Sequence, residues 1–344
     1  MSDLVRPWLV NGPFEDPALY LEFLHSRRAL LFDLGDLARL SSRQLLRVTH
    51  AFVSHTHMDH FVGFDRLLRP WLHRAGTLAL IGPAGFIDEV EHRVMSYRWN
   101  LLDANSTDFR LLVSEFGCHR LTGAAEFRAR EAFSRRDLPR PQEPAGVVLT
   151  EPDLLIEAVA LDHGVTSMAF ALREKVRVNV WRSALDELGY PVGPWLNEAK
   201  RAMRRGLPDD HPVEIPDHGT VLLGRLRERV FRTTRGQTVA YVTDAADHAA
   251  NRAKIVRLAI GADELFIEAA FLHRDRALAE ATCHLTAEAA GEIARTAGVG
   301  RVTPFHFSGR YLGRPEELSA ELWGAYRAAG AASTTLRCGE LSDD

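Results

Sequence analysis

Three histidines and an aspartate occupy six positions of the stretch FVSHTHMDHFVGF (52–64), directly after an apolar run. They are His55, His57, Asp59 and His60. A buried polar side chain without a partner costs free energy, so a protein interior tolerates this cluster only if something satisfies its nitrogens and oxygens. Imidazole nitrogen and carboxylate oxygen are both common metal ligands. The pattern therefore predicts a metal site.

Four such groups exceed the three protein ligands of a usual catalytic zinc site, which indicates two metals and further ligands elsewhere in the chain. Ligand sites commonly lie at the ends of strands. Three later residues have this context: His163 after 154–161, Asp244 after 238–243, and His306 in or after 301–307.

Each of these three residues also has a plain structural explanation. Asp162 and His163 could form an ordinary turn, Asp244 could cap a helix, and His306 between two phenylalanines could be a hydrogen-bonded core residue. Their order along the chain, each at the end of an expected strand, favours the metal site when they are taken together with the first motif.

The elements that must position these residues are short apolar or alternating segments bounded by Gly, Pro or charge. We expect strands at 29–34, 50–55, 77–82, 109–116, 154–161, 168–172, 238–243, 264–269 and 301–307. We expect helices at 65–72, 85–95, 247–258, 286–297 and 315–329, and two more within 179–206. Strands with helices in each half predict an α/β fold with two sheets faced by helices on the outside.

Composition sets broad limits. The chain has 344 residues, 46% hydrophobic and 26% charged, which is typical of a soluble globular protein. Its net charge of −4 argues against a uniformly basic nucleic-acid binder. We find no signal peptide and no membrane span in the sequence, and expect no membrane partner. Three isolated cysteines fit a reducing compartment, so we expect a cytoplasmic protein.

The order SHTHMDH, DHG, a strand-end aspartate and a late histidine resembles the metallo-β-lactamase superfamily. Three further segments are similar to its ribonuclease Z branch, the tRNA 3′-processing endonucleases: HFSGRY (306–311), GYPVGPWLNEAK (189–200) and CHLT (283–286). The resemblance covers roughly residues 28–310. It implies an αββα sandwich, in which two mixed sheets pack face to face with helices outside.

The resemblance implies two zinc ions in each chain. It assigns one ion to His55, His57 and His163, the other to Asp59, His60 and His306, and makes Asp244 the bridge between them. Asp33 would orient a ligand histidine from behind, although an ordinary turn aspartate before Gly35 is an open alternative. The same ligand set also accepts manganese or iron.

The implied reaction is hydrolysis of a phosphodiester bond. Two zinc ions about 3.5–4 Å apart can lower the pKa of a bridging water and stabilise both oxygens of an in-line displacement at phosphorus. Asp59 is placed to accept the proton of the nucleophile. The resemblance assigns the leaving-group proton to His284 with Glu268 as its orienting partner, and phosphate contacts to Arg310 and Ser308.

The chain departs from the ribonuclease Z pattern in three places. WLVNGPFEDPALYLEF (8–23) stands in place of a Gly/Ser-rich turn, IEAAF (267–271) keeps the glutamate but not the histidine of HEAT, and Gly309 replaces a proline. Removal of the 3′ trailer of precursor tRNA is the first expectation. A phosphodiesterase or other hydrolase with a small or different substrate is the alternative. A catalytically silent RNA-binding relative comes third, because the ligands and the proton donor are all present.

A basic arm is expected at about 173–235, within a single domain spanning 1–344. It contains thirteen Lys or Arg and nine Asp or Glu, whereas the rest of the chain sums to −8. This distribution fits one region that meets a phosphate backbone, with Arg201, Arg204 and Arg205 as candidate RNA contacts. A solvated helical hairpin that covers the sheet or helps to form a homodimer is the other interpretation.

Within the arm, Asn179 is expected to cap the first helix and Gly189 to end it, while Pro194 begins the second helix and Gly206 ends that one. Residues 133–146, rich in Pro and Arg, are expected to form a surface loop.

Overall fold

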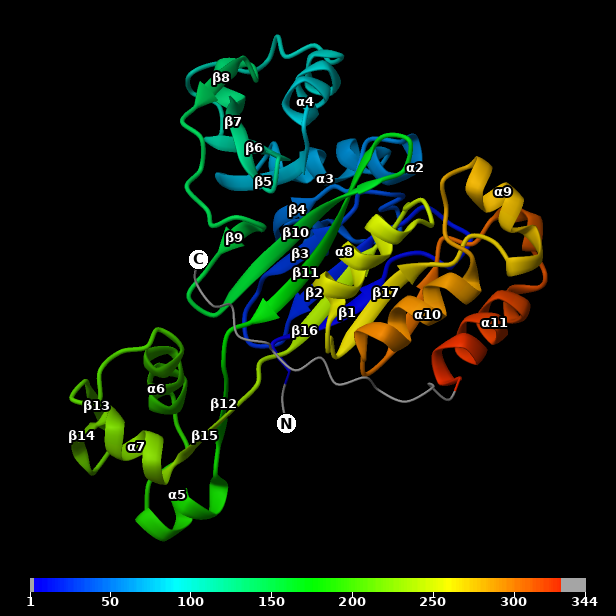
Figure 1. The fold of residues 1–344 in the computed structure, drawn as a ribbon. Coiled ribbons are helices and arrows are strands. Elements are labelled where there is room, and N and C mark those ends of the chain that lie inside the picture. The colour runs from blue at the N-terminus through cyan, green and yellow to red at the C-terminus, as the bar shows by residue number, and fades with distance from the viewer. Residues whose placement is uncertain (1–2, 329–344) are drawn as a thin grey trace, which may run out of the picture.

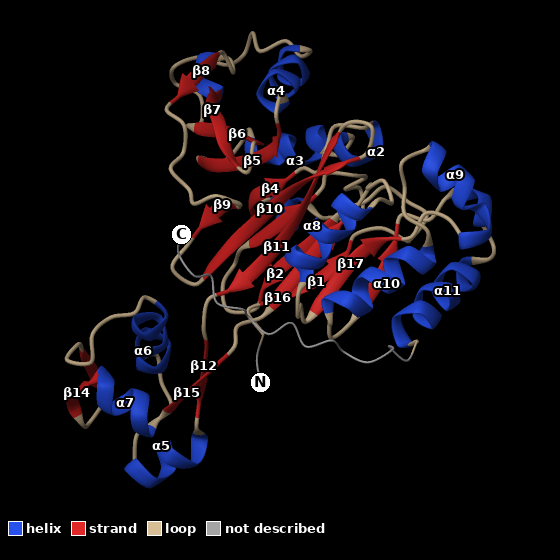
Figure 2. Cartoon of the chain, in the orientation of Figure 1, coloured by secondary structure: helices blue, strands red, loops and turns tan. Residues whose placement is uncertain are grey.

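The computed structural model describes residues 3–328 and shows two mixed sheets with helices on their outer faces (Figures 1 and 2). The first sheet has eight strands in sequential order, of which β3 to β6 run parallel and the others antiparallel. These strands are β1 (Val5–Leu9), β2 (Leu19–Phe23), β3 (Ala29–Phe32), β4 (Val48–Phe52), β5 (Gly76–Pro83), β6 (Phe109–Gly117), β7 (Arg120–Arg128) and β8 (Arg135–Leu138).

The second sheet has six strands in the order β18-β17-β16-β11-β10-β9. Its members are β9 (Val147–Thr150), β10 (Leu154–Asp162), β11 (Thr166–Glu174), β16 (Thr238–Val242), β17 (Glu264–Glu268) and β18 (Val302–Phe305). Strands β16, β17 and β18 are parallel, and β10 runs in the same direction because β11 is antiparallel to both β10 and β16.

Aromatic side chains fill the space between the two sheets. Phe32 from the first sheet packs on Phe170 from the second with ring centroids 5.3 Å apart, and Phe52 lies 5.7 Å from the same ring. All three are fully buried within one apolar cluster that draws on both sheets. Burial of such rings is a large part of the stabilising free energy of a sandwich core.

Helices cover the two outer faces. The first sheet packs against α1 (Ser42–Leu45), α2 (Met58–Phe61), α3 (Phe64–Trp71) and α4 (Phe86–Met95). The second sheet packs against α8 (Ala249–Ala259), α9 (Arg276–Ala281), α10 (Ala287–Ala297) and α11 (Pro315–Arg327). Three short 3-10 turns complete the body: η1 (Ala129–Glu131), η2 (His273–Asp275) and η3 (Gly309–Tyr311). The predicted αββα sandwich is confirmed.

The arm stands apart from the sandwich at the lower left of Figure 1 and has its own apolar cluster around Trp195. The antiparallel pair β12 and β15 joins it to the body. Its elements are β12 (Arg177–Val180), α5 (Arg182–Leu188), α6 (Trp195–Arg204), β13 (Pro212–Ile215), β14 (Gly219–Leu222), α7 (Leu223–Arg229) and β15 (Phe231–Thr234).

Two local predictions were wrong. Asn179 does not cap a helix but lies in β12, and α5 begins after Trp181 without a side-chain cap. The segment 133–146 is not all loop, because β8 within it pairs with β7; its sequence RRDL shows no apolar alternation that would reveal a strand. As predicted, Gly189 follows α5 and Gly206 follows α6 in the left-handed region, each with a φ of 67°.

Two predictions reach past the described residues. The helix expected at 315–329 ends at Arg327, and position 329 lies outside the described part of the chain. Cys118 and Cys283 are free thiols, whereas Cys338 also lies outside the described range. Within residues 3–328, no helix combines the length and the apolar character needed to cross a bilayer.

Candidate metal centre

Side chains of the predicted site follow six strands whose carboxyl ends meet at one edge of the sandwich. They are Asp33 after β3, His55 after β4, His163 after β10, Asp244 after β16, Glu268 at the end of β17 and His306 after β18. Open α/β sheets place ligand sites outside the carboxyl ends of their strands. The topology therefore gathers residues that are up to 273 positions apart in sequence, from Asp33 to His306.

The first motif combines a loop and a one-turn helix. His57 immediately precedes α2, and Asp59 and His60 lie within that helix. His60 is fully buried, whereas the Asp59 side chain is 44% exposed. Helix α2 can pack closely against the loop after β3 because residue 63 is glycine: a Cβ there would lie 2.1 Å from the carbonyl oxygen of Gly35.

Asp244 lies at the centre of the cluster. Its Oδ2 is 3.5 Å from His55 Nε2, 3.3 Å from His60 Nε2 and 3.3 Å from His163 Nε2. Its Oδ1 is 3.3 Å from His306 Nδ1. One carboxylate thus faces four imidazoles, which is the arrangement expected of a residue shared between two ions.

The seven predicted ligands fall into two groups. His55, His57, His163 and Asp244 form one group, and Asp59, His60 and His306 form another. Within each group the ligand atoms lie within 4.8 Å of one another. Asp59 Oδ2 is 3.2 Å from His306 Nε2, which closes the second group. Together the clusters provide a site suited to two metal ions.

Hydrogen bonds on the outer side fix the orientation of three histidines. His60 Nδ1 donates to Asp33 Oδ2 at 2.9 Å, and His163 Nδ1 donates to the carbonyl of Cys283 at 2.8 Å. His55 Nδ1 lies 3.0 Å from Ser54 Oγ, which itself donates to Asp33. With Nδ1 carrying the proton, each ring directs the lone pair of Nε2 toward the centre.

Unpartnered nitrogens show that the site fits a cation. Among the described residues, seven buried side-chain nitrogen or oxygen atoms lack a hydrogen-bond partner, and three of them belong to this cluster: His55 Nε2, His60 Nε2 and His306 Nδ1. Buried polar atoms are normally satisfied, so three orphans at one point call for a missing partner. Divalent metals accept nitrogen and carboxylate ligands in this combination.

The electrostatics of three of these ligands, His55, Asp244 and Asp59, agree with this reading. Burial, together with the neighbouring His60, lowers the pKa of His55 to about 2, so its imidazole is neutral and can ligate. Burial would raise the pKa of Asp244, but His306 and His60 hold it well below its usual value. The same holds for Asp59, whose pKa is lowered by the neighbouring His306 and His60 against the effect of burial. Both carboxylates are therefore ionised.

His284 and Glu268 form a pair beside the metal cluster. His284 Nδ1 lies 2.7 Å from Glu268 Oε2, and the His284 ring centroid is 4.8 Å from that of His163. Glu268 is itself fixed, since its Oε1 accepts from the backbone N–H of Ala245 at 2.7 Å. Burial alone would lower the pKa of His284, but the Glu268 carboxylate outweighs it and raises the pKa to about 9. His284 is thus protonated at neutral pH.

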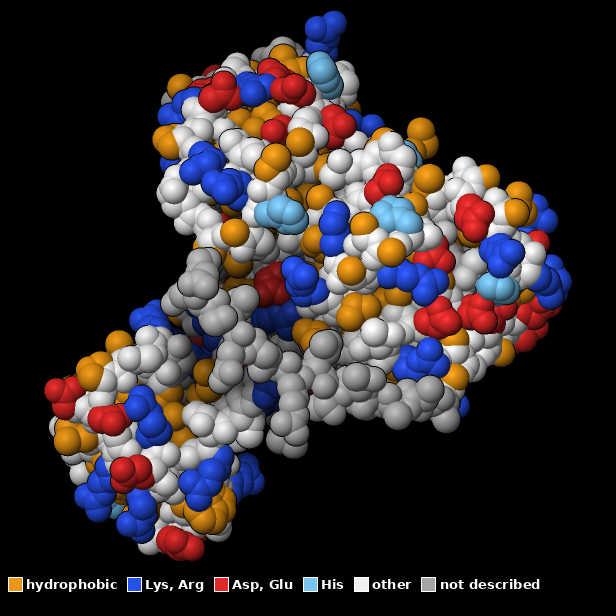
Figure 3. All heavy atoms as spheres, in the orientation of Figure 1, with side chains coloured by type: hydrophobic (Ala, Val, Ile, Leu, Met, Phe, Trp, Pro, Cys, Tyr) orange, Lys and Arg blue, Asp and Glu red, His pale blue; other side chains and the backbone are white. Residues whose placement is uncertain are grey.

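The residues expected to contact the substrate lie in two different regions of the structure. Ser308 precedes η3, and its Oγ accepts from the backbone N–H of Arg310 at 3.4 Å, so both lie beside His306. Arg205, at the end of α6, is exposed. Arg204 is largely buried. Its side chain is 17% exposed and faces Asp153 and Glu174 at 3.9 Å and 4.0 Å. Figure 3 shows basic and acidic side chains interspersed over the visible face of the arm.

Three of the residues that build the site have a backbone conformation that L-residues rarely adopt. The φ angle is 60° at Asp33, 37° at Asp244 and 58° at His306. Positive φ in residues other than glycine costs free energy and clusters at functional sites. All three follow the end of a strand, with Asp244 and His306 inside the cluster and Asp33 behind His60.

Two supporting residues escaped the sequence analysis. The Tyr241 hydroxyl donates to Asp33 Oδ2 at 2.8 Å, and the backbone N–H of Ser54 donates to Asp33 Oδ1 at 2.6 Å. Ser54 directly precedes His55, and this position is the only signal it gave. Tyr241 gave none, because it reads as one more apolar strand residue and lies 208 positions from Asp33.

Two curated relatives match most of the chain. The ribonuclease Z of Deinococcus radiodurans is 30% identical over 312 residues, which cover 88% of this chain and 90% of that protein. The ribonuclease Z of Halobacterium salinarum is 28% identical over 302 residues, which cover 85% and 82%.

Among solved structures, the metallo-β-lactamase fold protein YhfI from Bacillus subtilis matches with a TM-score of 0.52. It covers 94% of each chain at 15% sequence identity, so it supports the fold alone. No family model matches the chain.

Proposed function

Because the chain belongs to the ribonuclease Z family of metallo-β-lactamase fold proteins, we propose that it is a two-metal endoribonuclease that removes the 3′ trailer of precursor tRNA. The observation that carries the proposal is the convergence of unpartnered imidazole nitrogens on Asp244, beside the protonated His284. This geometry supports a metal-dependent hydrolase; the precursor tRNA substrate is the proposal.

Two divalent ions held by the seven ligands would supply Lewis acidity at phosphorus and at the attacking water. The zinc identity of these ions is part of the proposal, and manganese or iron would suit the same donors. The chain's own residues supply the remaining chemistry. Asp59 is ionised and 44% exposed, so its carboxylate can accept the proton of the attacking water at the mouth of the site.

His284 holds the proton that the leaving 3′ oxygen needs. Its Nδ1 is engaged by Glu268, so Nε2 is the atom that can donate to the substrate. Glu268 fixes the ring and keeps it protonated. Arg310, exposed just beyond His306, would bind a phosphate through its planar guanidinium.

A second candidate function is hydrolysis of a small phosphodiester. The observation that favours it is the mixed charge on the visible face of the arm, which gives less support to a long RNA contact than a continuous basic patch would. Both candidate functions use the same metal centre. They differ in the size of the substrate and in whether the arm contacts it.

Cleavage of an unprocessed tRNA transcript by the purified protein tests the first candidate. A single cut that separates the tRNA from its 3′ trailer, mapped by sequencing the products and absent in His57→Ala protein, is expected. Hydrolysis of bis-nitrophenyl phosphate without any cut in the transcript would favour the second candidate. Absence of both reactions with zinc or manganese supplied would leave the catalytically silent RNA-binding relative.

We further propose that the protein works in the cytoplasm as a homodimer and that the arm contacts RNA. The charge surplus of the arm over the acidic remainder supports the last point. Light scattering of the purified chain measures the oligomeric state directly.

A further inference from the structure

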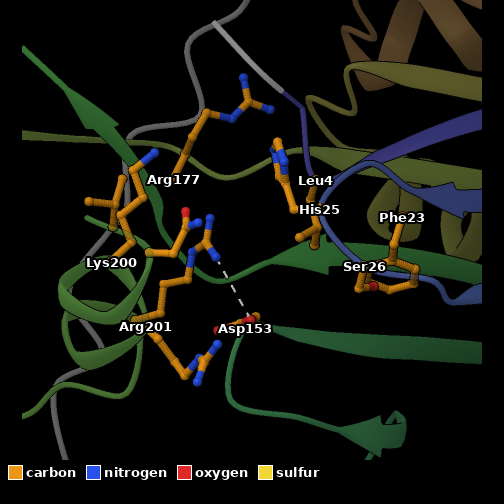
Figure 4. Close-up of a pocket in the computed structure, with 11 residues that line it drawn as sticks. Leu4, Phe23, His25, Ser26, Asp153, Arg177, Lys200 and Arg201 are labelled. Carbon is orange, nitrogen blue, oxygen red and sulfur yellow. Dashed lines mark ion pairs between the residues drawn. The ribbon is translucent and has the colours of Figure 1, made fainter. Parts of the chain in front are cut away.

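A cavity of about 370 Å³ lies where the arm meets the body (Figure 4). The arm contributes Arg177 from β12 and Lys200 and Arg201 from α6, which Figure 4 shows on one side of the cavity. The body contributes the turn His25–Ser26 between β2 and β3 on the other side. Arg204, Asp153 and Asn197 also line it.

This cavity is separate from the metal centre. Asp153 directly precedes β10 and His163 directly follows it. Ten residues of extended chain span about 33 Å, so the two sites lie at opposite ends of the sandwich. Whatever occupies the cavity does not touch the metal ligands.

The cavity carries positive charge that protein carboxylates only partly neutralise. Arg177 is paired, with Asp3 at 3.1 Å and Glu174 at 3.3 Å. Within residues 3–328, neither Lys200 nor Arg201 has a carboxylate oxygen within 4.0 Å. Burial and the neighbouring Arg204 lower the pKa of Lys200, as expected of a cation that lacks a counter-charge.

Two buried atoms in the same wall are unsatisfied by any residue in the described range 3–328. Arg204 Nε has no acceptor and Asp153 Oδ1 has no donor, and the closest approach between the two side chains is a long 3.9 Å. A ligand that answers both needs must offer acceptor oxygens and at least one hydroxyl donor. An inorganic anion that only accepts hydrogen bonds would leave Asp153 Oδ1 without a donor. The negative charge of the anion would also be repelled by the Asp153 carboxylate.

We propose that this cavity binds a ribose phosphate. The phosphate would lie against Lys200, Arg201 and Arg204, which offer the donors that phosphate oxygens prefer, and a ribose hydroxyl would donate to Asp153. A volume of about 370 Å³ suits a ligand of that size. The ribose phosphate belongs either to a free nucleotide or to an RNA chain, and bound there it joins α6 of the arm to the body.

The chain offers a direct test, because it has only three lysines, at 175, 200 and 254. Limited acetylation of the purified, metal-loaded protein, followed by mass spectrometry, measures the reactivity of each lysine separately. Adenosine 5′-monophosphate at about ten times its Kd should slow acetylation of Lys200 about ten-fold by mass action. Lys175 and Lys254 do not line the cavity and serve as internal controls with unchanged rates.

Variants then locate the contacts. Arg201→Gln should weaken binding of the protecting nucleotide about ten-fold, the loss expected for one charge-assisted contact. Arg205→Gln, one residue past the end of α6 and outside the cavity, should not change the affinity for the nucleotide. Asp153→Ala should weaken binding of the nucleotide but not binding of inorganic phosphate, which has no ribose hydroxyl. Equal melting temperatures would show that the variants are folded.

The source of the ribose phosphate follows from a second probe. If adenosine 5′-monophosphate protects Lys200, the cavity accepts a free nucleotide; if only a short single-stranded RNA protects it, the RNA chain is the ligand. Failure of both probes to protect Lys200, or an equal loss in Arg201→Gln and Arg205→Gln, would overturn the proposal. None of these results depends on whether the metal centre cuts tRNA.

Discussion

The Asp33 carboxylate lies 2.9 Å from His60 Nδ1, and both side chains are fully buried. It also accepts from Ser54 and Tyr241, so four donor groups converge on this one carboxylate. His60 therefore has one rotamer and one tautomer that satisfy its surroundings, and both direct Nε2 toward the candidate metal site.

Asp33→Asn should lower metal affinity by about 10–100-fold, the usual effect of removing a hydrogen-bond partner behind a ligand histidine. The asparagine amide would present its own donors to a site that contains only donors. Metal retained after equilibrium dialysis, measured by mass spectrometry, is the test. Asp36→Asn is the matched control, because Asp36 is exposed in the same loop. Wild-type metal content in Asp33→Asn would contradict the role of Asp33.

Removal of metal should destabilise the protein as well as inactivate it. A ligand that binds only the folded state contributes about 2.7 kcal/mol when present at about a hundred times its Kd. Chelation should therefore lower the melting temperature, and added zinc should restore both the temperature and hydrolysis. His57→Ala should shrink this shift, whereas His92→Ala, on the exposed side of α4, should not. A chelator-independent melting temperature would argue against a bound metal.

Loss of the proton donor should depend on the leaving group. His284→Ala should retain metal but slow cleavage of RNA by about 10²–10⁴-fold, the range for general acid catalysis. The same variant should act nearly normally on a nitrophenyl diester, because nitrophenolate leaves without a proton. His273→Ala, at a 50% exposed histidine, is the control. Equal losses on both substrates would rule out proton donation by His284.

Exposed arginines on α7 should matter only for long substrates. Arg225 and Arg229 are exposed and, among the described residues, have no ion pair. Replacing both with glutamine should raise KM for precursor tRNA and flatten the logarithmic salt dependence by about 0.9 for each lost phosphate contact. Hydrolysis of a small diester should not change. Arg98→Gln, an exposed site on the body, controls for general charge; unchanged KM in the arm variant would mark the arm as structural.

His50 in β4 should make stability fall in acid. Burial and the neighbouring Arg28 lower its pKa from 6.5 to about 4, so the folded state binds this proton less readily than the unfolded state. The contribution is complete above pH 6.5 and is lost as the pH falls toward 4, with an upper limit of about 3 kcal/mol. Urea unfolding at pH 7.5 and pH 5 should show a smaller loss for His50→Gln than for wild type. Identical losses would refute the assignment.

The sandwich and the ligand loops could be predicted from the sequence because short local patterns of residues indicate both. Apolar runs of the right length mark β4, β10 and β16, and the residues that follow them are of types that bind metal. What local patterns cannot report is which distant side chain satisfies a buried group. Tyr241 and Ser54 against Asp33 are such partners, and nothing in the neighbourhood of Tyr241 announces its contact.

The arm shows the same limit. Helices α5 and α6 were predicted from periodicity and glycine stops, whereas α7 was not. Arg204 was expected on an RNA-binding surface and instead faces Asp153 on the body. A sequence gives the charge of an arginine but not its direction. The strand β12 was missed for a related reason, since four residues of mixed polarity do not distinguish a strand from a helix cap.

The positive φ angles at Asp33, Asp244 and His306 imply that the ligand loops have the lowest local stability in the fold when no ion is bound. Each such residue costs on the order of 1–3 kcal/mol, and without metal only hydrogen bonds oppose that cost. Local opening should therefore begin at these strand ends rather than in the aromatic layer between the sheets. Amide hydrogen exchange in the metal-free protein would be fastest at the edge where the chemistry takes place, and metal loading would act there as a clamp.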